Sequence, residues 1–411
     1  MVKLKNHLKQ YSKNGKLFLV NSFISFFTMS AFSILLGIFL KEKQYGEAFV
    51  GSIMSIQIIA MGIGSLPSVF MLNHWGSRRS LILSLLLIAI GGVGQVVTNH
   101  EIMIIIYSIL YGVGFGIQFT VEPLFLTENS SPVERMSLFS LNFVLKNIAM
   151  MIGNFSTGYI SDYLKQHMSS VEAIRWILVG CSFLTLTGIY AVLKMEESTM
   201  KEKQTHNSFL AGYREMMNLP VVLYLLYNAL IGLGAGMVVP FFSVYLKYSL
   251  HVDDMMVGSI LSFAQLGTVL GGMLISTLAR KIGKPQSVVL CQMLSIPFLL
   301  SIAFPQGLMM VAVSFFMRSS LMNMAQPVLQ NLSMDLVQKE SRASFSSFLA
   351  LSNNILRGSG VYLGGIIMER FTYNTPYYFT VSMYFMGTIL FMMIFMKDQL
   401  WKVKKQFQKQ S

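Results

Sequence analysis

Residues 122–153, EPLFLTENSSPVERMSLFSLNFVLKNIAMMIG, decide the fold of this chain. An apolar segment ends here, a short polar loop turns the chain, and a second apolar segment begins. The same pattern returns in residues 340–360, ESRASFSSFLALSNNILRGSG. Three residues recur at an offset of 207 positions: Arg135 and Arg342, Asn147 and Asn354, and Gly153 and Gly360.

The offset of 207 positions holds over most of half the chain. VGSIMS at 50–55 matches VGSILS at 257–262. Further pairs at this offset are Asn21 and Asn228, Glu47 and Asp254, and Gly76 and Gly283. The chain therefore reads as two copies of one unit. We expect an N-terminal bundle over 1–194, a linker over 195–216 and a C-terminal bundle over 217–411.

The composition places these units in a membrane. The 411 residues are 54% hydrophobic and only 12% charged, whereas soluble domains carry about 25% charged residues. A membrane-spanning helix needs about 20 mostly apolar residues. Six such segments are found in each half: 17–40, 49–72, 80–98, 102–127, 137–160 and 172–194, then 218–246, 255–279, 286–304, 306–332, 343–367 and 374–396.

The basic residues predict the orientation in the membrane. Most of the 31 Lys and Arg residues lie in the loops and tails on the side of the N-terminus, and such residues are retained on the cytoplasmic side. We therefore expect a multi-pass protein of the plasma membrane with both termini cytoplasmic. The net charge of +13 is dispersed over short loops, which argues against a nucleic-acid partner. The first apolar segment is too long for a signal peptide.

The turn after the second segment, GIGSLPSVFMLNHWGSRRSLIL, carries a partial motif. Gly76, Arg78 and Arg79 stand where the pattern G-x-L-a-D-R-x-G-R-R requires them, and Asn73 takes the place of the acidic residue. The second half repeats this motif as STLARKIGK (276–284), with Arg280 at the acidic position. Because each motif follows the second segment of its repeat, the chain resembles the major facilitator superfamily.

This resemblance implies an all-α membrane protein with two parallel six-helix repeats around a central cavity. It also implies that the turn containing Asn73, Gly76, Arg78 and Arg79 acts in gating. Asn73 lacks the negative charge with which the acidic residue of the family helps to lock the cytoplasmic side. Arg78 and Arg79 have a plainer interpretation as topology anchors near lipid headgroups. In the family the first, fourth, seventh and tenth helices line the cavity. The matching polar residues are Asn21, Glu122 and Asn228, with Asn323 and Gln326 on the tenth segment.

Four ionisable residues fall inside the predicted spans: Glu122, Lys146, Arg318 and Arg357. A charge at this depth costs at least about 2.5–3.5 kcal/mol and persists mainly when it is paired or faces water. If Glu122 pairs with Lys146, the two arginines have no acid in their own half. An anionic substrate would supply the missing charge, because the guanidinium fork suits carboxylate and phosphate. Alternatively, the cations bind helix-end carbonyls or form a salt bridge between the halves.

Glu122 has two interpretations. It is the one carboxylate well inside a predicted span, so in a proton-coupled mechanism it would carry the proton, since burial raises the pKa of a carboxyl group. A structural pair with Lys146 is the other interpretation.

Taken together, these features predict a secondary transporter of a small organic solute that works by alternating access, with an anionic substrate favoured. The alternative is a proton-driven multidrug exporter, to which the many Met and Phe side chains would offer an adaptable surface. A remote alternative, a membrane-embedded enzyme, lacks paired carboxylates, a metal cluster or a P-loop. We expect no catalytic residues, no cofactor and no metal, and a monomer as the working unit.

Overall fold

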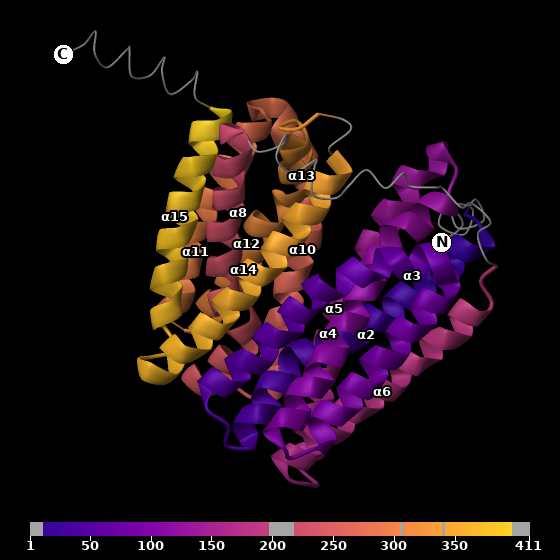
Figure 1. Cartoon of the computed structure of the whole chain (residues 1–411). Coiled ribbons are helices and arrows are strands. Elements are labelled where there is room, and N and C mark those ends of the chain that lie inside the picture. The colour runs from indigo at the N-terminus through magenta and orange to yellow at the C-terminus, as the bar shows by residue number, and fades with distance from the viewer. Residues whose placement is uncertain (1–10, 197–217, 305–306, 339–341, 397–411) are drawn as a thin grey trace, which may run out of the picture.

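The computed structural model describes residues 11–196, 218–304, 307–338 and 342–396. Within these ranges every regular element is a helix (Figure 1). The all-α fold predicted from the apolar segments is therefore confirmed. Almost all of the expected linker over 195–216 lies outside the described residues.

The first half contains five long helices that account for six predicted spans. They are α2 (Lys13–Glu42), α3 (Glu47–Val97), α4 (Glu101–Glu128), α5 (Pro132–Lys165) and α6 (Ser170–Leu193). Helix α3 combines two spans, Glu47–Leu72 and His74–Val97. The chain bends near the start of the second span at Gly76, whose φ of 79° is a conformation that favours glycine.

The second half repeats this order with more breaks. Its helices are α8 (Leu219–Val238), η1 (Val239–Phe241), α9 (Phe242–Val244), η2 (Tyr245–Ser249), α10 (Asp254–Ile282), α11 (Lys284–Ala303), α12 (Leu308–Met324), α13 (Gln326–Met334), α14 (Arg342–Arg370) and α15 (Thr375–Phe395). Gly283, 207 positions after Gly76, separates α10 from α11 with a φ of 97°. Eleven segments of the described chain are long and apolar enough to cross a membrane, and the 29-residue α14 occupies the remaining predicted span.

Local sequence fixes the helix starts. Ser131 accepts a hydrogen bond from the amide of Glu134, and Pro132 follows as the first helical residue of α5. Ser169 and Asp253 cap α6 and α10 in the same way. These caps satisfy amide groups that have no partner within the helix.

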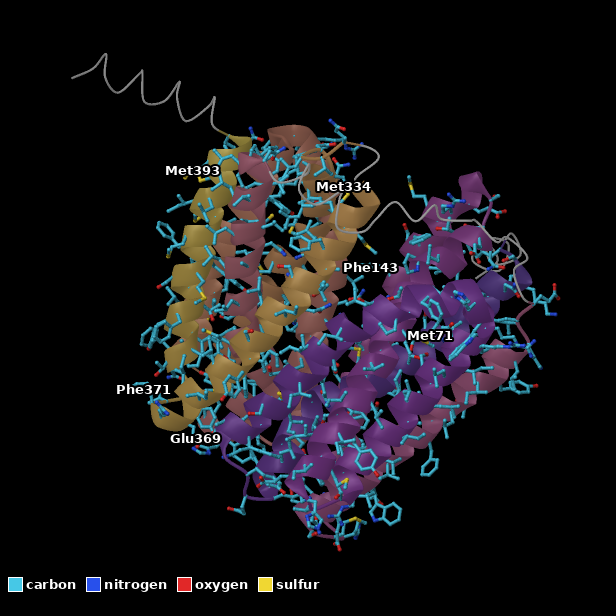
Figure 2. The ribbon with its side chains drawn as sticks, viewed as in Figure 1. Met71, Phe143, Met334, Glu369, Phe371 and Met393 are labelled. Atoms are coloured by element: carbon cyan, nitrogen blue, oxygen red, sulfur yellow. The ribbon has the colours of Figure 1, made fainter. Side chains whose placement is uncertain are left out.

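The two halves touch at one end and diverge at the other (Figure 1). Pairs of helices from opposite halves pack closely: α3 with α14, and α5 with α10. We call the end where they meet, near Glu47 and Glu369, the closed end. The opposite end, where α2 begins and α15 finishes, is the open end. Figure 2 places Glu369 and Phe371 at the closed end and Met334 and Met393 at the open end.

The largest apolar core lies toward the closed end and takes side chains from both halves. Ile38 and Phe39 of α2 belong to the same buried cluster as Val244 and Leu246 of the second half. Each half also has a smaller core of its own. Burial across the interface therefore stabilises the contact at the closed end.

Candidate functional site

A cavity of about 640 Å³ lies between the halves. Its wall comes mainly from α8, α10, α12, α13 and α14. The first half contributes four residues: Ser33, Ile34, Met150 and Asn154. Lining residues such as Ser333 and Ser346, which flank the loop between α13 and α14, extend the cavity toward the open end. The site is thus central, as expected, but strongly asymmetric.

Two arginines line the cavity. Arg318 of α12 is 5% exposed. Its Nη2 donates a hydrogen bond of 3.1 Å to the hydroxyl of Tyr384 on α15, and its guanidinium carbon lies 5.2 Å from the ring centre of Phe242. Arg357 of α14 lines the same cavity. In the described part of the chain the Nε atoms of both arginines are buried without a hydrogen-bond partner.

The cavity wall carries positive charge without a compensating acid. Among the described residues that line it there is no Asp or Glu. A buried charge costs several kcal/mol unless it is paired or hydrated. Among the described residues that line this cavity, the two guanidinium groups therefore have no counter-charge.

Side-chain amides supply the rest of the polar surface. Asn353 donates to Asn228 Oδ1 over 3.2 Å, and Asn323 donates to Thr268 Oγ1 over 3.0 Å. Seven amide side chains from the second half line the cavity together with the arginines: Asn228, Gln265, Asn323, Gln326, Gln330, Asn353 and Asn354. Amides both donate and accept, so this surface suits hydroxyl and carbonyl groups of a ligand.

A break in the tenth predicted span shapes one wall. Helix α12 ends at Met324, and α13 begins at Gln326 with Pro327 in its first turn. Proline has no amide hydrogen and cannot continue the hydrogen bonding of α12. The break exposes Gln326 and Gln330, which line the cavity.

Close packing of α14 on α8 positions Arg357. A Cβ atom on Gly360 would lie 2.1 Å from the carbonyl oxygen of Leu233, and one on Gly364 would lie 2.5 Å from that of Met237. These glycines therefore allow the two backbones to approach. On the same face of α14, about one and two turns earlier, Arg357 and Asn353 line the cavity.

Glu122 and Lys146 form the pair that the sequence suggested. Lys146 Nζ lies 2.6 and 2.8 Å from the two carboxylate oxygens of Glu122, and Asn142 donates to the same carboxylate over 2.8 Å. The ammonium group also lies 4.4 Å from the ring centre of Phe26. Neither Glu122 nor Lys146 lines the cavity. Substrate contact by Lys146 thus has no geometric support here.

Asn21 also lies away from the cavity, although the resemblance implied that it lines it. Its side chain is fully buried, and a Cβ atom on Gly188 of α6 would lie 2.8 Å from its Oδ1. One turn further, Thr185 of α6 donates to Thr28 over 3.0 Å. Asn21 and Thr28 of α2 therefore face α6 within the first half. Polar residues that recur with the 3.6-residue helical period can face a neighbouring helix as well as water.

The predicted gating turn lies at the open end. Gly76 forms the bend within α3, with Arg78 half-buried and Arg79 exposed. The side chain of Asn73 lies outside the described part of the chain. Within the described ranges, no ion pair crosses between the halves at this end.

The geometry agrees with sequence comparisons over the whole chain. A family model for the Major Facilitator Superfamily matches residues 18–232 and 224–410. The chain belongs to this superfamily. Membership confirms the resemblance seen in the repeat and in the turn motif.

Sequence relatives within the superfamily are distant. The glucose transporter GlcP of Staphylococcus epidermidis is 26% identical over 153 residues, which cover 36% of this chain and 32% of GlcP. The MFS-type transporter criB of Aspergillus cristatus is 26% identical over 194 residues, covering 44% of this chain and 42% of criB. YwtG of Bacillus subtilis is 25% identical over 162 residues, covering 39% of this chain and 34% of YwtG. The matches thus span less than half the length of these relatives.

Solved structures share the fold. The nucleoside transporter NupG superposes with a TM-score of 0.77 at 13% identity, covering 93% of this chain and 99% of NupG. A D-xylose–proton symporter gives 0.73 at 12% identity, covering 93% and 97%. At these identities the similarity concerns the arrangement of helices in this superfamily member, and its substrate has to be argued from its own cavity.

Sequence reasoning missed two residues of the cavity. Tyr384 and Phe242 hold Arg318 from α15 and α9, yet each is an aromatic residue in an apolar run, where packing is the default interpretation. The helical period of α15 does not indicate that the hydroxyl of Tyr384 contacts the charged group of Arg318.

Proposed function

We propose that this protein transports a small organic anion by alternating access, with the negative charge bound between Arg318 and Arg357. One observation carries the proposal: the described cavity wall holds two guanidinium groups and no carboxylate. Arg suits carboxylate and phosphate because its planar fork donates two parallel hydrogen bonds. The anion offsets positive charge in a site where unpaired charge is costly.

The amide side chains that line the cavity favour an anion whose uncharged part carries several hydroxyl groups. Asn228 and Asn353 already exchange a hydrogen bond with each other and would extend donors and acceptors to the substrate. GlcP, NupG and the xylose symporter are named for sugars or nucleosides. A sugar acid or a sugar phosphate has both a negative charge and several hydroxyl groups.

The multidrug-exporter alternative has less support in this cavity. A lipophilic cation would meet Arg318 and Arg357 with no acid beside them, and like charges in a low-dielectric site repel strongly. Glu122, the carboxylate that such a mechanism would use, lies outside the cavity and is already paired with Lys146. We therefore assign Glu122 to a structural ion pair and leave the driving ion of transport open.

The proposal is tested with three ligands that share one body: glucose, glucuronate and glucose 6-phosphate. A ligand bound by the folded state alone raises the unfolding free energy by RT ln(1 + [L]/Kd). We expect the two anions to raise the Tm of the purified protein and glucose to raise it much less. Arg318→Gln or Arg357→Gln should abolish this difference.

The matched control is Arg79→Gln, which removes one guanidinium from an exposed position at the open end. It should retain the stabilisation by anions. An equal response to all three ligands would favour a neutral sugar substrate. Stabilisation by a lipophilic cation such as tetraphenylphosphonium, with none by the anions, would favour the exporter.

A further inference from the structure

Two pairs of glycines join the halves, and both follow the 207-residue repeat. A Cβ atom on Gly158 of α5 would lie 2.3 Å from the carbonyl oxygen of Asp254, and 3.2 Å from the Cα of Gly258 on α10. The repeat-related glycines are Gly365 of α14 and Gly51 of α3, where a Cβ on either would lie 3.0 Å from the Cα of the other. Backbones of opposite halves therefore touch at two equivalent crossings.

Beside each crossing, an acid of one half caps a helix of the other half. Asp162 of α5 accepts the amide hydrogens of Met255 over 2.6 Å and Asp254 over 3.2 Å. Glu369 of α14 accepts the amide hydrogen of Ala48 over 2.6 Å. Asp162 and Glu369 are 207 positions apart, as are Ala48 and Met255. Each carboxylate thus meets the positive end of α10 or α3 and satisfies amides that have no partner in the helix.

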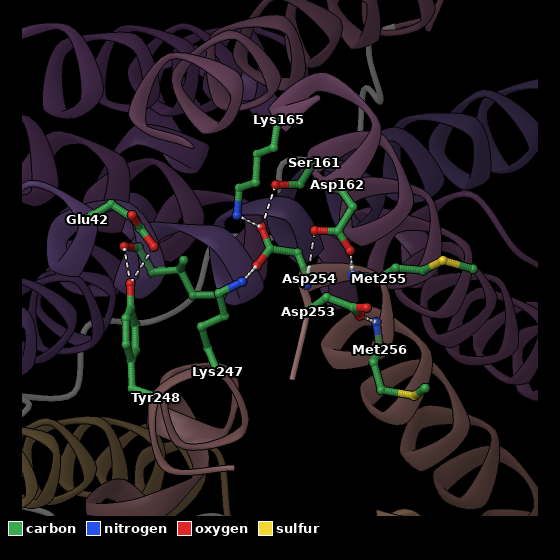
Figure 3. Close-up of polar contacts among 11 residues, drawn as sticks. Glu42, Ser161, Asp162, Lys165, Lys247, Tyr248, Asp253, Asp254, Met255 and Met256 are labelled. Carbon is green, nitrogen blue, oxygen red and sulfur yellow. Dashed lines mark hydrogen bonds and ion pairs between the residues drawn. The ribbon is translucent and has the colours of Figure 1, made fainter. Parts of the chain in front are cut away.

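The first residue of each capped helix is also acidic, and here the two crossings differ. Asp254 is fully buried, and Figure 3 shows its carboxylate among Lys165, Ser161 and Lys247. It pairs with Lys165 of the other half and with Lys247 at 2.8 Å, and it accepts a hydrogen bond of 2.6 Å from Ser161. Its repeat counterpart, Glu47, pairs with Lys41 of its own half at 2.6 Å and meets the other half through the neutral hydroxyl of Tyr373.

One further hydrogen bond joins the two halves at the closed end. Tyr248, next to Lys247, donates across the halves to the carboxylate of Glu42 over 2.9 Å. We define latch A as Ala48, Glu47, Glu369 and Tyr373, and latch B as Ser161, Asp162, Lys165, Asp254 and Met255.

We propose that latches A and B hold the closed end together, and that latch B is the stronger because Asp254 forms an ion pair with the opposite half. Opening this end separates Lys165 from Asp254 and exposes the first turns of α3 and α10. Removing the carboxylate of Asp254 leaves Lys165 and Lys247 close together without a counter-charge, which is strongly unfavourable in a buried site. The closed end should then open. This inference concerns the conformation of the empty protein and does not depend on the substrate.

The experiment measures distances between spin labels by double electron–electron resonance in lipid nanodiscs. Labels on His100→Cys and Phe371→Cys report the closed end, and labels on His74→Cys and Lys281→Cys report the open end; all four positions are exposed. The buried Cys181 and Cys291 are replaced by Ala. Asp254→Asn should increase the population with a long distance at the closed end several-fold, and shorten the distance at the open end.

The matched control is Asp253→Asn, the same change of charge one residue earlier. Asp253 caps its own helix through the amide of Met256, so this variant should retain the distances of the parent protein. If folded Asp254→Asn has the same distances as the parent, the proposal is wrong. If Glu47→Gln opens the closed end as much as Asp254→Asn, the assigned difference between the latches is wrong.

Two milder variants keep the proposal testable if Asp254→Asn fails to fold. Asp162→Asn and Glu369→Gln weaken the cap of one helix each and leave the buried ion pairs in place. Each should increase the long-distance population at the closed end, and the double variant should increase it further. Unchanged distances in both single variants would overturn the role of the caps.

Discussion

Arg318 shows how the neighbours of one side chain set its function. Its guanidinium is held between the Tyr384 hydroxyl and the Phe242 ring, while Nε keeps no partner in the described chain. Two of its contacts thus fix the orientation of the group and leave donors for a ligand. A group held in this way loses little freedom on binding, which favours affinity.

Removing the Tyr384 hydroxyl should weaken anion binding. In Tyr384→Phe the guanidinium loses an oriented partner, and a hydrogen bond to a charged group contributes roughly 1.5 kcal/mol or more. We expect the Kd of a stabilising anion to rise about tenfold, which corresponds to about 1.4 kcal/mol, as measured by titration of the Tm. Tyr378→Phe, an exposed tyrosine on the same helix, is the control. An unchanged Kd in Tyr384→Phe would remove this residue from the site.

The pair of Glu122 and Lys146 should behave as a structural unit. Both side chains are only partly exposed, at 14% and 17%. Glu122→Gln or Lys146→Gln alone leaves one charge uncompensated. Either should cost about 2 kcal/mol of unfolding free energy, less than the loss of one partner from a fully buried pair.

The double variant Glu122→Gln/Lys146→Gln should lose less stability than the sum of the single changes, because no unpaired charge remains. Thermal unfolding of the four proteins gives the coupling energy. If Glu122→Gln instead keeps its Tm and abolishes the pH dependence of transport, Glu122 acts as the proton carrier.

Among the helices, α14 joins the cavity to the packing between elements. One of its faces contacts α8 through Gly360 and Gly364, and the same helix carries Arg357 to the cavity and Glu369 to the closed end. Any shift of α14 therefore moves Arg357 of the cavity and Glu369 of latch A together. Substitutions at its glycines should affect both binding and stability.

Gly360→Ala tests this packing. The new methyl group would lie 2.1 Å from the Leu233 carbonyl oxygen, so the two helices must separate, at a cost of about 1–3 kcal/mol. We expect a lower Tm and weaker anion binding. Gly180→Ala is the control, because nothing lies within 4 Å of its added methyl. Equal Tm values for the two variants would contradict the close approach of α14 and α8.

The sequence predicted the positions of the helices along the chain far better than which face of each helix points to the cavity. Apolar length located every span, and the repeat paired Gly76 with Gly283, where the chain bends in each half, because these features depend on local composition and on glycine. Asn21 and Asn228 occupy equivalent repeat positions, yet Asn21 faces α6 while Asn228 lines the cavity. Helical period alone does not distinguish a neighbouring helix from water. For Asp254 the sequence indicated only its repeat relation to Glu47, because Ser161 and Lys165, its partners in the other half, are far away in the chain.

For the whole molecule, the predicted orientation in the membrane is open to a direct test. His100 lies exposed at the closed end, between α3 and α4, and His74 lies exposed at the open end. If both termini are cytoplasmic, a membrane-impermeant maleimide added to intact cells should label His100→Cys and leave His74→Cys unmodified. Permeabilised cells should label both, and the parent protein is the control for Cys181 and Cys291, which are buried. The reverse pattern would invert the topology.

The two arginines of the cavity also give the transporter an electrical property. An empty cavity carries two fixed positive charges, and the side of the membrane to which it opens changes during the proposed cycle. A membrane potential acts on such charges with up to about 2.3 kcal/mol per charge per 100 mV. A cell interior that is negative would therefore draw the empty protein toward the state that opens inward. Once a dianion neutralises Arg318 and Arg357, the same reorientation carries no net charge, and voltage ceases to bias it.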